Sequence, residues 1–445
     1  MRRNHHNQLR LPTPRIDHPH ARELELISGV LDEHPTIAVL VTQDLVGEGV
    51  DPNLGRPGLT GEQVFRIGVL KQLKGSTYAE LAFHLSDSRS YRRFCRFGLG
   101  DSPPSLSALQ DNVSQIKPAT WEAINRVLVR HARAEGIEQG NKVRIDTTVT
   151  QTNIHEPDDA AQLWDTVRVI DRILRKALKA GFKLKYSRRT KRAKRRRLDV
   201  MNAKRKGARR RAYRDLVRVT LEVLDFADAA ILVLPDNEPL AMALARNLQH
   251  FAELGRRVVD QTNRRVFDGE VVPAQDKVVS IFEPHTDIIV KGSRDVQFGH
   301  KVCFTAGESS LVIDMLVTQG NRADATLVAP MLDRATKVLG RVPRQAAFDG
   351  GFASRANLDA AKALGVKDVC FSKRRGIDIT DMVKSRWVYK QLRRFRAGVE
   401  GVISFLKRVF GLDRCTWRGS NGFKAYAWAS VVACNLLIIA RNMPE

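Results

Sequence analysis

The stretch VRIDTTVT, residues 143–150, decides the fold. Val143 and Ile145 alternate with Arg144 and Asp146, and this period of two predicts a β-strand after a mostly helical region. We expect the apolar part of this strand to end at Asp146. A strand placed between helical segments predicts the α/β fold class.

Further strand and helix signals follow along the chain. We expect strands at residues 278–282, 288–290, 301–305, 311–318, 346–348 and 369–371. A hairpin turn falls at residues 306–310, between two of these strands. Helices are expected over residues 323–339, 354–364, 389–409 and 423–441. Together these signals define one α/β domain over residues 141–445, with a helical basic insertion over residues 158–256.

The region before the first strand is predicted to be all helical. Thr60 with Gln63, and Thr77 with Glu80, have the spacing of capping boxes at helix starts. We therefore expect a helical N-terminal domain over residues 21–137, preceded by a basic tail over residues 1–20. Such a domain is a candidate for DNA binding through a helix-turn-helix, and a purely structural helical core is the alternative.

The charge balance points to a polyanionic partner. Lys and Arg number 74 against 49 Asp and Glu, which gives a formal net charge of +25. Nucleic acid and an anionic membrane surface both suit such an excess. The most apolar stretch, residues 425–440, contains Ser430 and Asn435 and falls short of the roughly 20 apolar residues of a membrane span. We expect a buried helix there and no membrane partner.

The cysteines and the N-terminus indicate the compartment. The five cysteines are far apart and form no C-x-x-C pair, which argues against a disulfide framework and a structural zinc site. The first 20 residues are rich in Arg and His and have no apolar core, so no secretory signal is recognised. We expect a cytoplasmic, nucleoid-associated protein.

The densest run of positive charge lies inside the predicted insertion, at residues 183–214. It contains a single acid, Asp199. A solvated helix face is the usual role of such a run, but its density favours contacts to DNA phosphates. The candidate DNA-binding residues are Arg188, Arg189, Lys191, Arg192, Arg195, Arg196 and Arg197.

Two acids follow short apolar strands, and a third lies on a helix. Asp146 and Asp349 come after apolar runs, and Asp349 precedes Gly350 and Gly351, which would leave room for a ligand. Each acid alone would suit a helix cap or a turn, but two together favour a metal site. Asp314 is a competing candidate, ranked lower because no Gly-Gly pair follows it.

Arg396, Glu400 and Lys407 recur at offsets of four and seven residues and therefore share one helix face. A ladder of surface ion pairs is the alternative explanation of this spacing. Since Val399 and Val402 make the helix partly buried, Glu400 needs a partner.

These motifs, in this order, resemble the DDE transposases of bacterial insertion sequences. The residues that carry the likeness are IDTT at 145–148, FDGGF at 348–352, and Arg396 with Glu400 and Lys407. The last three match the Arg, Glu and Lys of the family's Tyr-Arg-Glu-Lys signature. Its Tyr is absent, because Arg393 stands at the expected position and Tyr389 lies one turn earlier.

The resemblance implies a ribonuclease-H-like catalytic domain that cleaves and rejoins DNA. It implies that Asp146, Asp349 and Glu400 bind two Mg²⁺ ions, with Mn²⁺ as an alternative, and that Arg396 and Lys407 contact DNA phosphates. Double-stranded DNA of the element ends and target would be the partner, and a homo-oligomer would act on paired ends. A nuclease that cuts without joining, and a non-catalytic nucleic-acid-binding protein, remain the alternative hypotheses.

Overall fold

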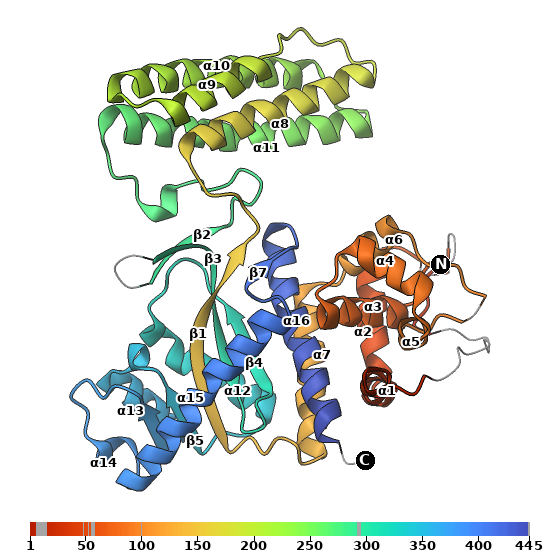
Figure 1. Cartoon of the computed structure of the whole chain (residues 1–445), viewed down its shortest axis with the longest axis vertical. Helices are drawn as coiled ribbons and strands as arrows, with labels where there is room; N and C mark the ends of the chain where they lie inside the picture. The colour runs from red at the N-terminus through yellow and green to blue at the C-terminus, as the bar shows by residue number, and fades with distance from the viewer. Residues whose placement is uncertain are drawn as a thin grey trace. The chain divides into compact units, whose positions relative to one another are not determined.

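The computed structural model describes residues 1–5, 16–47, 49–51, 53–54, 58–98, 100–291 and 295–443. The chain divides into two compact units, which are described separately. The first joins Met1–Asn153 to Gly299–Glu445, and the second is Ile154–Phe298. The fold is mixed α/β, as the sequence predicts, with a helical N-terminal region and a mixed sheet (Figure 1).

The sheet has the strand order β2-β3-β1-β5-β6, with β4 paired to β3 and β7 paired to β1. Strand β1 is antiparallel to β3, which is antiparallel to β4, whereas β5 is parallel to both β1 and β6. The strands are β1 (Lys142–Thr152), β2 (Asp287–Lys291), β3 (Asp295–Ala306), β4 (Val312–Val317), β5 (Gln345–Phe348), β6 (Asp368–Phe371) and β7 (Arg414–Cys415).

Helices that follow the sheet strands pack onto the sheet. The long helix α15 contacts β1, β5 and β6 and crosses in front of β1 in Figure 1, while α12 packs on β4. Their apolar faces share one core with the buried residues of β1, β5 and β6. These helices are α12 (Val328–Leu339), α13 (Arg355–Ala363), α14 (Ile379–Met382) and α15 (Arg386–Val409), with 3₁₀ turns at Asp324–Leu327 and Gly350–Phe352.

Seven helices precede the sheet in the described part of the chain. Both predicted capping boxes are present, with Thr60 and Gln63 exchanging hydrogen bonds at the start of α3, and Thr77 and Glu80 at the start of α4. The helices are α1 (Pro19–Asp32), α2 (Thr36–Val46), α3 (Gly61–Lys74), α4 (Tyr78–Asp87), α5 (Arg89–Phe94), α6 (Leu106–Val113) and α7 (Pro118–Ala134).

The closing helix α16 (Gly419–Asn442) completes the core of these N-terminal helices. It packs against α1, α3 and α7 and belongs to the same hydrophobic cluster. The helices over residues 21–137, expected to form a domain of their own, share one compact unit with the sheet, because α16 supplies apolar surface to these helices and also contacts β4.

Helix α16 is long and apolar enough to span a membrane, but 89% of its apolar window is buried within the fold. Asn435, in its middle, has its amide fully used: Oδ1 accepts from the backbone N–H of Val312, and Nδ2 donates to the Val312 carbonyl and to Asn125 Oδ1. A buried amide with partners is a feature of a protein core. The prediction of a buried helix is confirmed.

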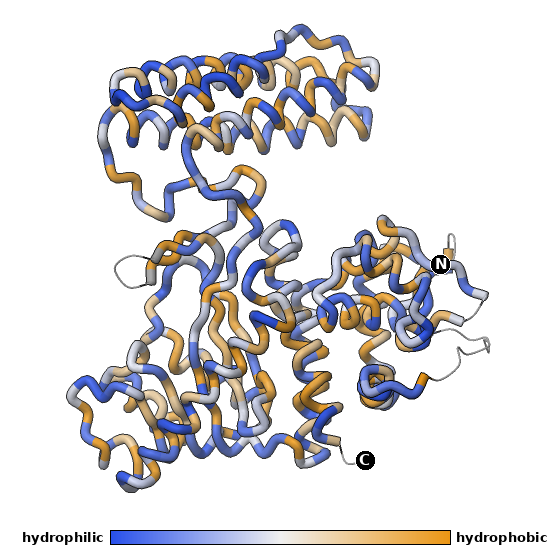
Figure 2. Tube along the Cα trace, in the orientation of Figure 1, coloured by the Kyte–Doolittle hydropathy of each residue, from blue (hydrophilic) through white to orange (hydrophobic). Residues whose placement is uncertain are grey.

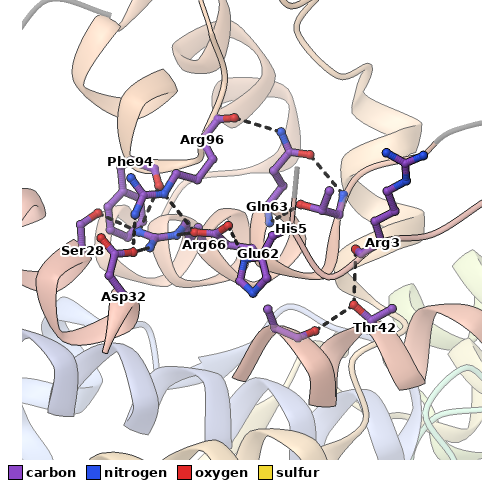
Figure 3. A network of polar contacts seen from close by, with 12 residues as sticks. Arg3, His5, Ser28, Asp32, Thr42, Glu62, Gln63, Arg66, Phe94 and Arg96 are labelled. Atoms are coloured by element: carbon purple, nitrogen blue, oxygen red, sulfur yellow. Dashed lines mark hydrogen bonds and ion pairs between the residues drawn. The ribbon is translucent and has the colours of Figure 1, made fainter. Parts of the chain in front are cut away.

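An arginine network holds the N-terminal helices together (Figure 3). Arg66 of α3 is 1% exposed and donates to Glu62 Oε1 at 3.0 Å, Asp32 Oδ1 at 2.6 Å and Ser28 Oγ at 2.7 Å. Arg96 contacts the same two carboxylates. Two cations therefore balance two anions, which is what a buried ion cluster requires.

The second unit is built on four long helices: α8 (Asp159–Lys179), α9 (Thr190–Asn202), α10 (Lys206–Val233) and α11 (Pro239–Thr262). Their buried apolar residues form one core. Figure 2 shows hydrophilic and hydrophobic residues alternating along these helices, as amphipathic packing requires. Short π- and 3₁₀-helical turns follow at Asn263–Asp268 and Ala274–Asp276. The helical part thus ends at Thr262, six residues beyond the expected boundary at 256.

Two further expectations need comment. The strand predicted at residues 278–282 is wrong, because the backbone N–H groups of Val278 and Ile281 donate to the side chains of Gln261 and Gln162 rather than to a neighbouring strand. Half of the tail predicted over residues 1–20, namely residues 6–15, lies outside the described residues. Where the description resumes, α1 already begins at Pro19.

Candidate active site

The sheet brings two of the predicted acids together. In the parallel pairing of β1 with β5, Ile145 lies opposite Phe348, so Asp146 and Asp349 follow paired residues on adjacent strands. Asp349 comes directly after β5, as expected. Asp146 does not end its strand, because β1 continues to Thr152 through its antiparallel pairing with β3.

Gly350 and Gly351 serve close packing rather than a sharp turn. Neither has a positive φ. A Cβ atom at Gly350 would lie 2.7 Å from the Lys373 side chain, and one at Gly351 would lie 2.9 Å from Asp324 Oδ2. The two glycines therefore admit a cationic and an anionic side chain beside Asp349, instead of leaving the open space that the sequence analysis expects.

Helix α15 adds the third acid and a shared cation. Arg396 Nη2 lies 2.9 Å from Asp146 Oδ2 and 3.4 Å from Asp349 Oδ1, and its Nη1 lies 3.2 Å from Glu400 Oε1. One guanidinium thus contacts all three predicted carboxylates, which come from β1, the end of β5 and α15. Arg396 is 16% exposed, so this contact is shielded from water on most sides.

Gly398 of α15 leaves room for the Arg144 side chain. A Cβ atom there would lie 2.1 Å from Arg144 Nη1. That guanidinium donates to the Phe395 carbonyl at 3.0 Å and to Ser310 Oγ at 2.8 Å. A larger residue at position 398 would force the guanidinium to move and would disturb these two hydrogen bonds, one of which ties α15 to β1.

The two aspartates differ in their proton affinity. Burial raises the pKa of Asp146, and the charge of Asp349 adds to this, against the opposing effects of the Thr147 N–H and Arg396. Burial would raise the pKa of Asp349 as well. Its pKa is nevertheless lowered, because Ser372 Oγ donates to it at 2.7 Å and the Gly350 N–H and Arg396 also favour the ionised form.

Glu400 is the most accessible of the three acids, with 69% of its side chain exposed against 43% for Asp349. Its carboxylate lies at the mouth of a hollow beside β1. The residues lining this hollow are Asp146, Thr147, Thr148, Glu400, Ile403, Ser404, Lys407, Arg408 and Asp413. Lys407 lines it and is ion-paired with Asp413 at 3.2 Å.

The donor set fits a hard divalent cation. All three acids offer carboxylate oxygens, which Mg²⁺ prefers, and their common partner in this structure is itself a cation. Across the described residues, the one group of three ligand atoms within 4.8 Å of one another lies elsewhere, at Glu33, His34 and His131. The acids of the candidate site are therefore spread around Arg396, and ion binding would draw them inward.

Sequence reasoning misses Asp324, which begins the 3₁₀ turn after β4. Its Oδ1 accepts from Thr147 Oγ1 at 3.1 Å and from Lys301 Nζ at 3.1 Å, so it lies next to the residue that follows Asp146. No periodicity or spacing marks this aspartate, and only the fold brings it near the site. Asp314, the competing candidate, is buried and bound by Arg334, which gives it a structural role.

Tyr389, which lies one turn before the position of the absent signature tyrosine, bonds to the sheet and not to the three acids. Its hydroxyl donates to the Phe371 carbonyl at 2.9 Å, and the residue is buried. Arg393, at the position expected for the tyrosine, lies over the Tyr389 ring.

The candidate DNA-binding residues of the insertion fall into two groups. Arg188, Arg189, Arg192 and Arg196 pair with acids of neighbouring helices, namely Asp171, Glu222 and Asp215. Lys191 and Arg195 on α9 are exposed, and neither has an ion-pair partner among the residues described. Arg197 is half-buried, with its Nε lacking a hydrogen-bond partner in the same set.

Two known families match parts of the chain. The family described as Transposase DDE domain matches residues 257–436, which include Asp349 and Glu400 but not β1. The family described as Transposase domain (DUF772) matches residues 14–115, over the N-terminal helices. Searches of curated proteins and of solved structures found no match.

Both matches belong to one class of proteins, the transposases. Together with the order of the motifs, they are consistent with a DDE transposase of an insertion element.

Proposed function

We propose that this transposase catalyses Mg²⁺-dependent cleavage and strand transfer of DNA at the ends of an insertion element. The observation that carries the proposal is the single guanidinium of Arg396 in contact with three carboxylates from three separate segments. Three acids around one arginine leave an excess of negative charge, and divalent cations would balance it.

The topology supports a ribonuclease-H-like catalytic domain. Three antiparallel strands, β4, β3 and β1, are followed across the sheet by the parallel strands β5 and β6. The acids lie on the central strand, at the end of its parallel neighbour and on the covering helix. This arrangement is the one that the resemblance to DDE transposases implies.

In this proposal Asp146, Asp349 and Glu400 hold two Mg²⁺ ions, or Mn²⁺ in their place. The bound ions would stabilise the attacking and leaving oxygens of an in-line displacement at phosphorus. Ser372 orients Asp349, and the Thr147 amide orients Asp146, at 2.7 and 2.8 Å. Arg396, displaced from the carboxylates by the ions, becomes available to a DNA phosphate.

Two displacements would follow at this site. Water attacks the phosphorus at the element end, the bond to the 3′-oxygen breaks, and a free 3′-hydroxyl remains. That hydroxyl then attacks a target phosphorus and displaces a target 3′-oxygen. Lys407 and Arg408 line the same hollow and would contact the DNA backbone.

The insertion and the N-terminal helices would bind the rest of the DNA. Lys191 and Arg195 carry exposed positive charge suited to phosphate contacts. Insertion arginines already paired with acids are weaker candidates, because DNA would have to compete with Asp215 and its neighbours. Action on paired ends would require a homo-oligomer, and the substrate places the protein in the cytoplasm with the nucleoid.

The test is cleavage and joining of DNA that carries the element's own flanks, with Mg²⁺ present. We expect joined products from the wild type and none from Glu400→Gln, with DNA binding retained. Asp359→Asn is the matched control, since it removes an exposed carboxylate from α13 without touching the site. Cleavage without joining would favour a nuclease, and binding without any strand breakage would favour a non-catalytic protein.

A further inference from the structure

A second cluster of possible metal ligands lies among the N-terminal helices. Glu33 ends α1, His34 follows it in the corner before α2, and His131 lies near the end of α7. One ligand atom from each residue lies within 4.8 Å of the others. Two imidazoles and one carboxylate form a common zinc-ligand set in proteins.

The distances are close to those of a coordinated ion. With metal–ligand bonds of about 2.0–2.2 Å, the ligand atoms of a tetrahedral zinc site stand roughly 3.3 Å apart. Glu33 Oε2 already lies 3.6 Å from His131 Nδ1, which is too long for a hydrogen bond. The two imidazole rings meet edge to face with centroids 5.0 Å apart. Small side-chain rotations would close the set around an ion.

Unsatisfied polar atoms provide a second, independent observation. The Nε2 atoms of His34 and His131 are both buried and lack a hydrogen-bond partner within the described part of the chain. His131 as a whole is only 6% exposed. An unpaired buried nitrogen costs roughly 1–3 kcal/mol, so an imidazole that bound an ion through its Nε2 would be relieved of this cost.

Glu33 supplies a negative charge, and with 57% of its side chain exposed it leaves the site open to solvent on one side.

We propose that Glu33, His34 and His131 bind a borderline divalent transition-metal ion, with Zn²⁺ as the first choice and water as the fourth ligand. The ion would fasten the corner between α1 and α2 onto α7, the helix that leads into β1 and its Asp146. The ligand set of two nitrogens and one oxygen differs from the all-oxygen set around Arg396, so the two sites would select different ions.

The experiment is calorimetric titration of the full chain, freed of metal, with Zn²⁺. It is done in the background Asp146→Asn, Asp349→Asn, Glu400→Gln, so that the carboxylates around Arg396 bind nothing. We expect one equivalent of Zn²⁺ to bind and the melting temperature to rise. Tetrahedral Co²⁺ bound at the same site would show intense visible absorption.

The ligand variants decide the outcome. Glu33→Gln changes an exposed side chain, so the fold survives, and we expect Zn²⁺ affinity to fall more than about 100-fold, beyond the usual effect of losing an outer-shell contact. His34→Gln and His131→Gln should lose more. His250→Gln, at an exposed histidine of α11, should bind as the parent does. Unchanged affinity in all three ligand variants, or no binding by the parent at micromolar Zn²⁺, would overturn the proposal.

Discussion

Two arginines of the first compact unit, Arg66 and Arg396, both contact carboxylates. The two clusters differ in how many positive charges accompany the carboxylates. Arg66 shares Asp32 and Glu62 with a second cation, Arg96, and is almost completely buried. Arg396 contacts three carboxylates, those of Asp146, Asp349 and Glu400, at the edge of an open hollow.

A structural ion cluster differs from a metal-binding site in its net charge. A balanced cluster has no excess charge to attract a further ion, so its ion pairs serve to hold the helices together. A cluster with excess negative charge opposes folding unless a cation arrives from outside. Charge balance, rather than the presence of an arginine–carboxylate contact, therefore separates the two regions.

The largest expected effect concerns activity, with only a small change in stability. Asp349→Asn should reduce strand cleavage more than about 10³-fold, a loss typical of removing a central catalytic group. The free energy of unfolding, measured with a chelator present, should fall only slightly at neutral pH, because the lowered pKa of Asp349 means that its ionised form favours folding through Ser372 and Arg396. Cleavage assays and urea denaturation of the same preparation check this. A large loss of stability would mean that Asp349 belongs to the fold.

The reverse pattern is expected at the balanced cluster. Glu62→Ala should lower the free energy of unfolding by about 3 kcal/mol, because Arg66 is left buried with one carboxylate fewer. Urea denaturation measures this change. Cleavage by the folded fraction should stay close to wild type. Asp17→Ala, which removes a partner of the exposed Arg22, is the matched control and should cost well under 1 kcal/mol.

A third prediction addresses Arg396 directly. If its guanidinium competes with divalent cations for the three acids, Arg396→Gln should bind Mn²⁺ about tenfold more tightly, which corresponds to about 1.4 kcal/mol. Cleavage should nevertheless fall, since the cation proposed to contact DNA is lost. Paramagnetic titration of Mn²⁺ gives the affinity. Weaker Mn²⁺ binding in this variant would show that Arg396 helps to assemble the site rather than blocking it.

The smallest expected effect is on the pH dependence of the protein's stability. Burial would raise the pKa of Glu62. The nearby Arg66, His5 and Arg96 nevertheless lower the pKa of this carboxyl below its ordinary value of 4.5. Its stabilising contribution is therefore complete above that value and is lost as the pH falls through the lower, folded value. Thermal unfolding between pH 7 and pH 3 should show a smaller loss of stability in Glu62→Gln than in wild type.

Asp146 should behave in the opposite way in the same scan. Burial raises its pKa, so the folded state takes up a proton before the unfolded state does, and the ionised form disfavours folding at neutral pH. Asp146→Asn should therefore unfold at a slightly higher temperature at pH 7, with the difference vanishing towards acid pH. A lower melting temperature at pH 7 would contradict this sign.

Local sequence patterns predict part of the fold and part of the candidate site. The alternation around Asp146 predicts β1, the capping boxes predict α3 and α4, and the four-residue spacing predicts that Arg396 and Glu400 share a face of α15. Their contact at 3.2 Å follows from that spacing alone. The catalytic role of these residues stays a prediction until it is measured.

The features that local patterns did not predict depend on contacts between segments that are far apart in the sequence. Asp324 comes near Thr147 because β4 and its following turn pack beside β1, and nothing in its neighbours encodes this. The absence of a side chain at Gly398 leaves room for Arg144, which comes from a strand distant in the sequence. Residues 278–282 look like a strand, yet they bond to glutamines of α8 and α11, which no periodicity reveals.

The position of α16 has a consequence for synthesis. The apolar faces of α1, α3 and α7 emerge from the ribosome early, but the helix that covers them is translated after every other described helix. Chains that stop before Gly419 would expose those faces and be prone to aggregation or proteolysis. We therefore expect frameshifted or truncated copies of such an element to leave few stable fragments able to occupy its DNA ends, so that defective copies interfere little with intact ones.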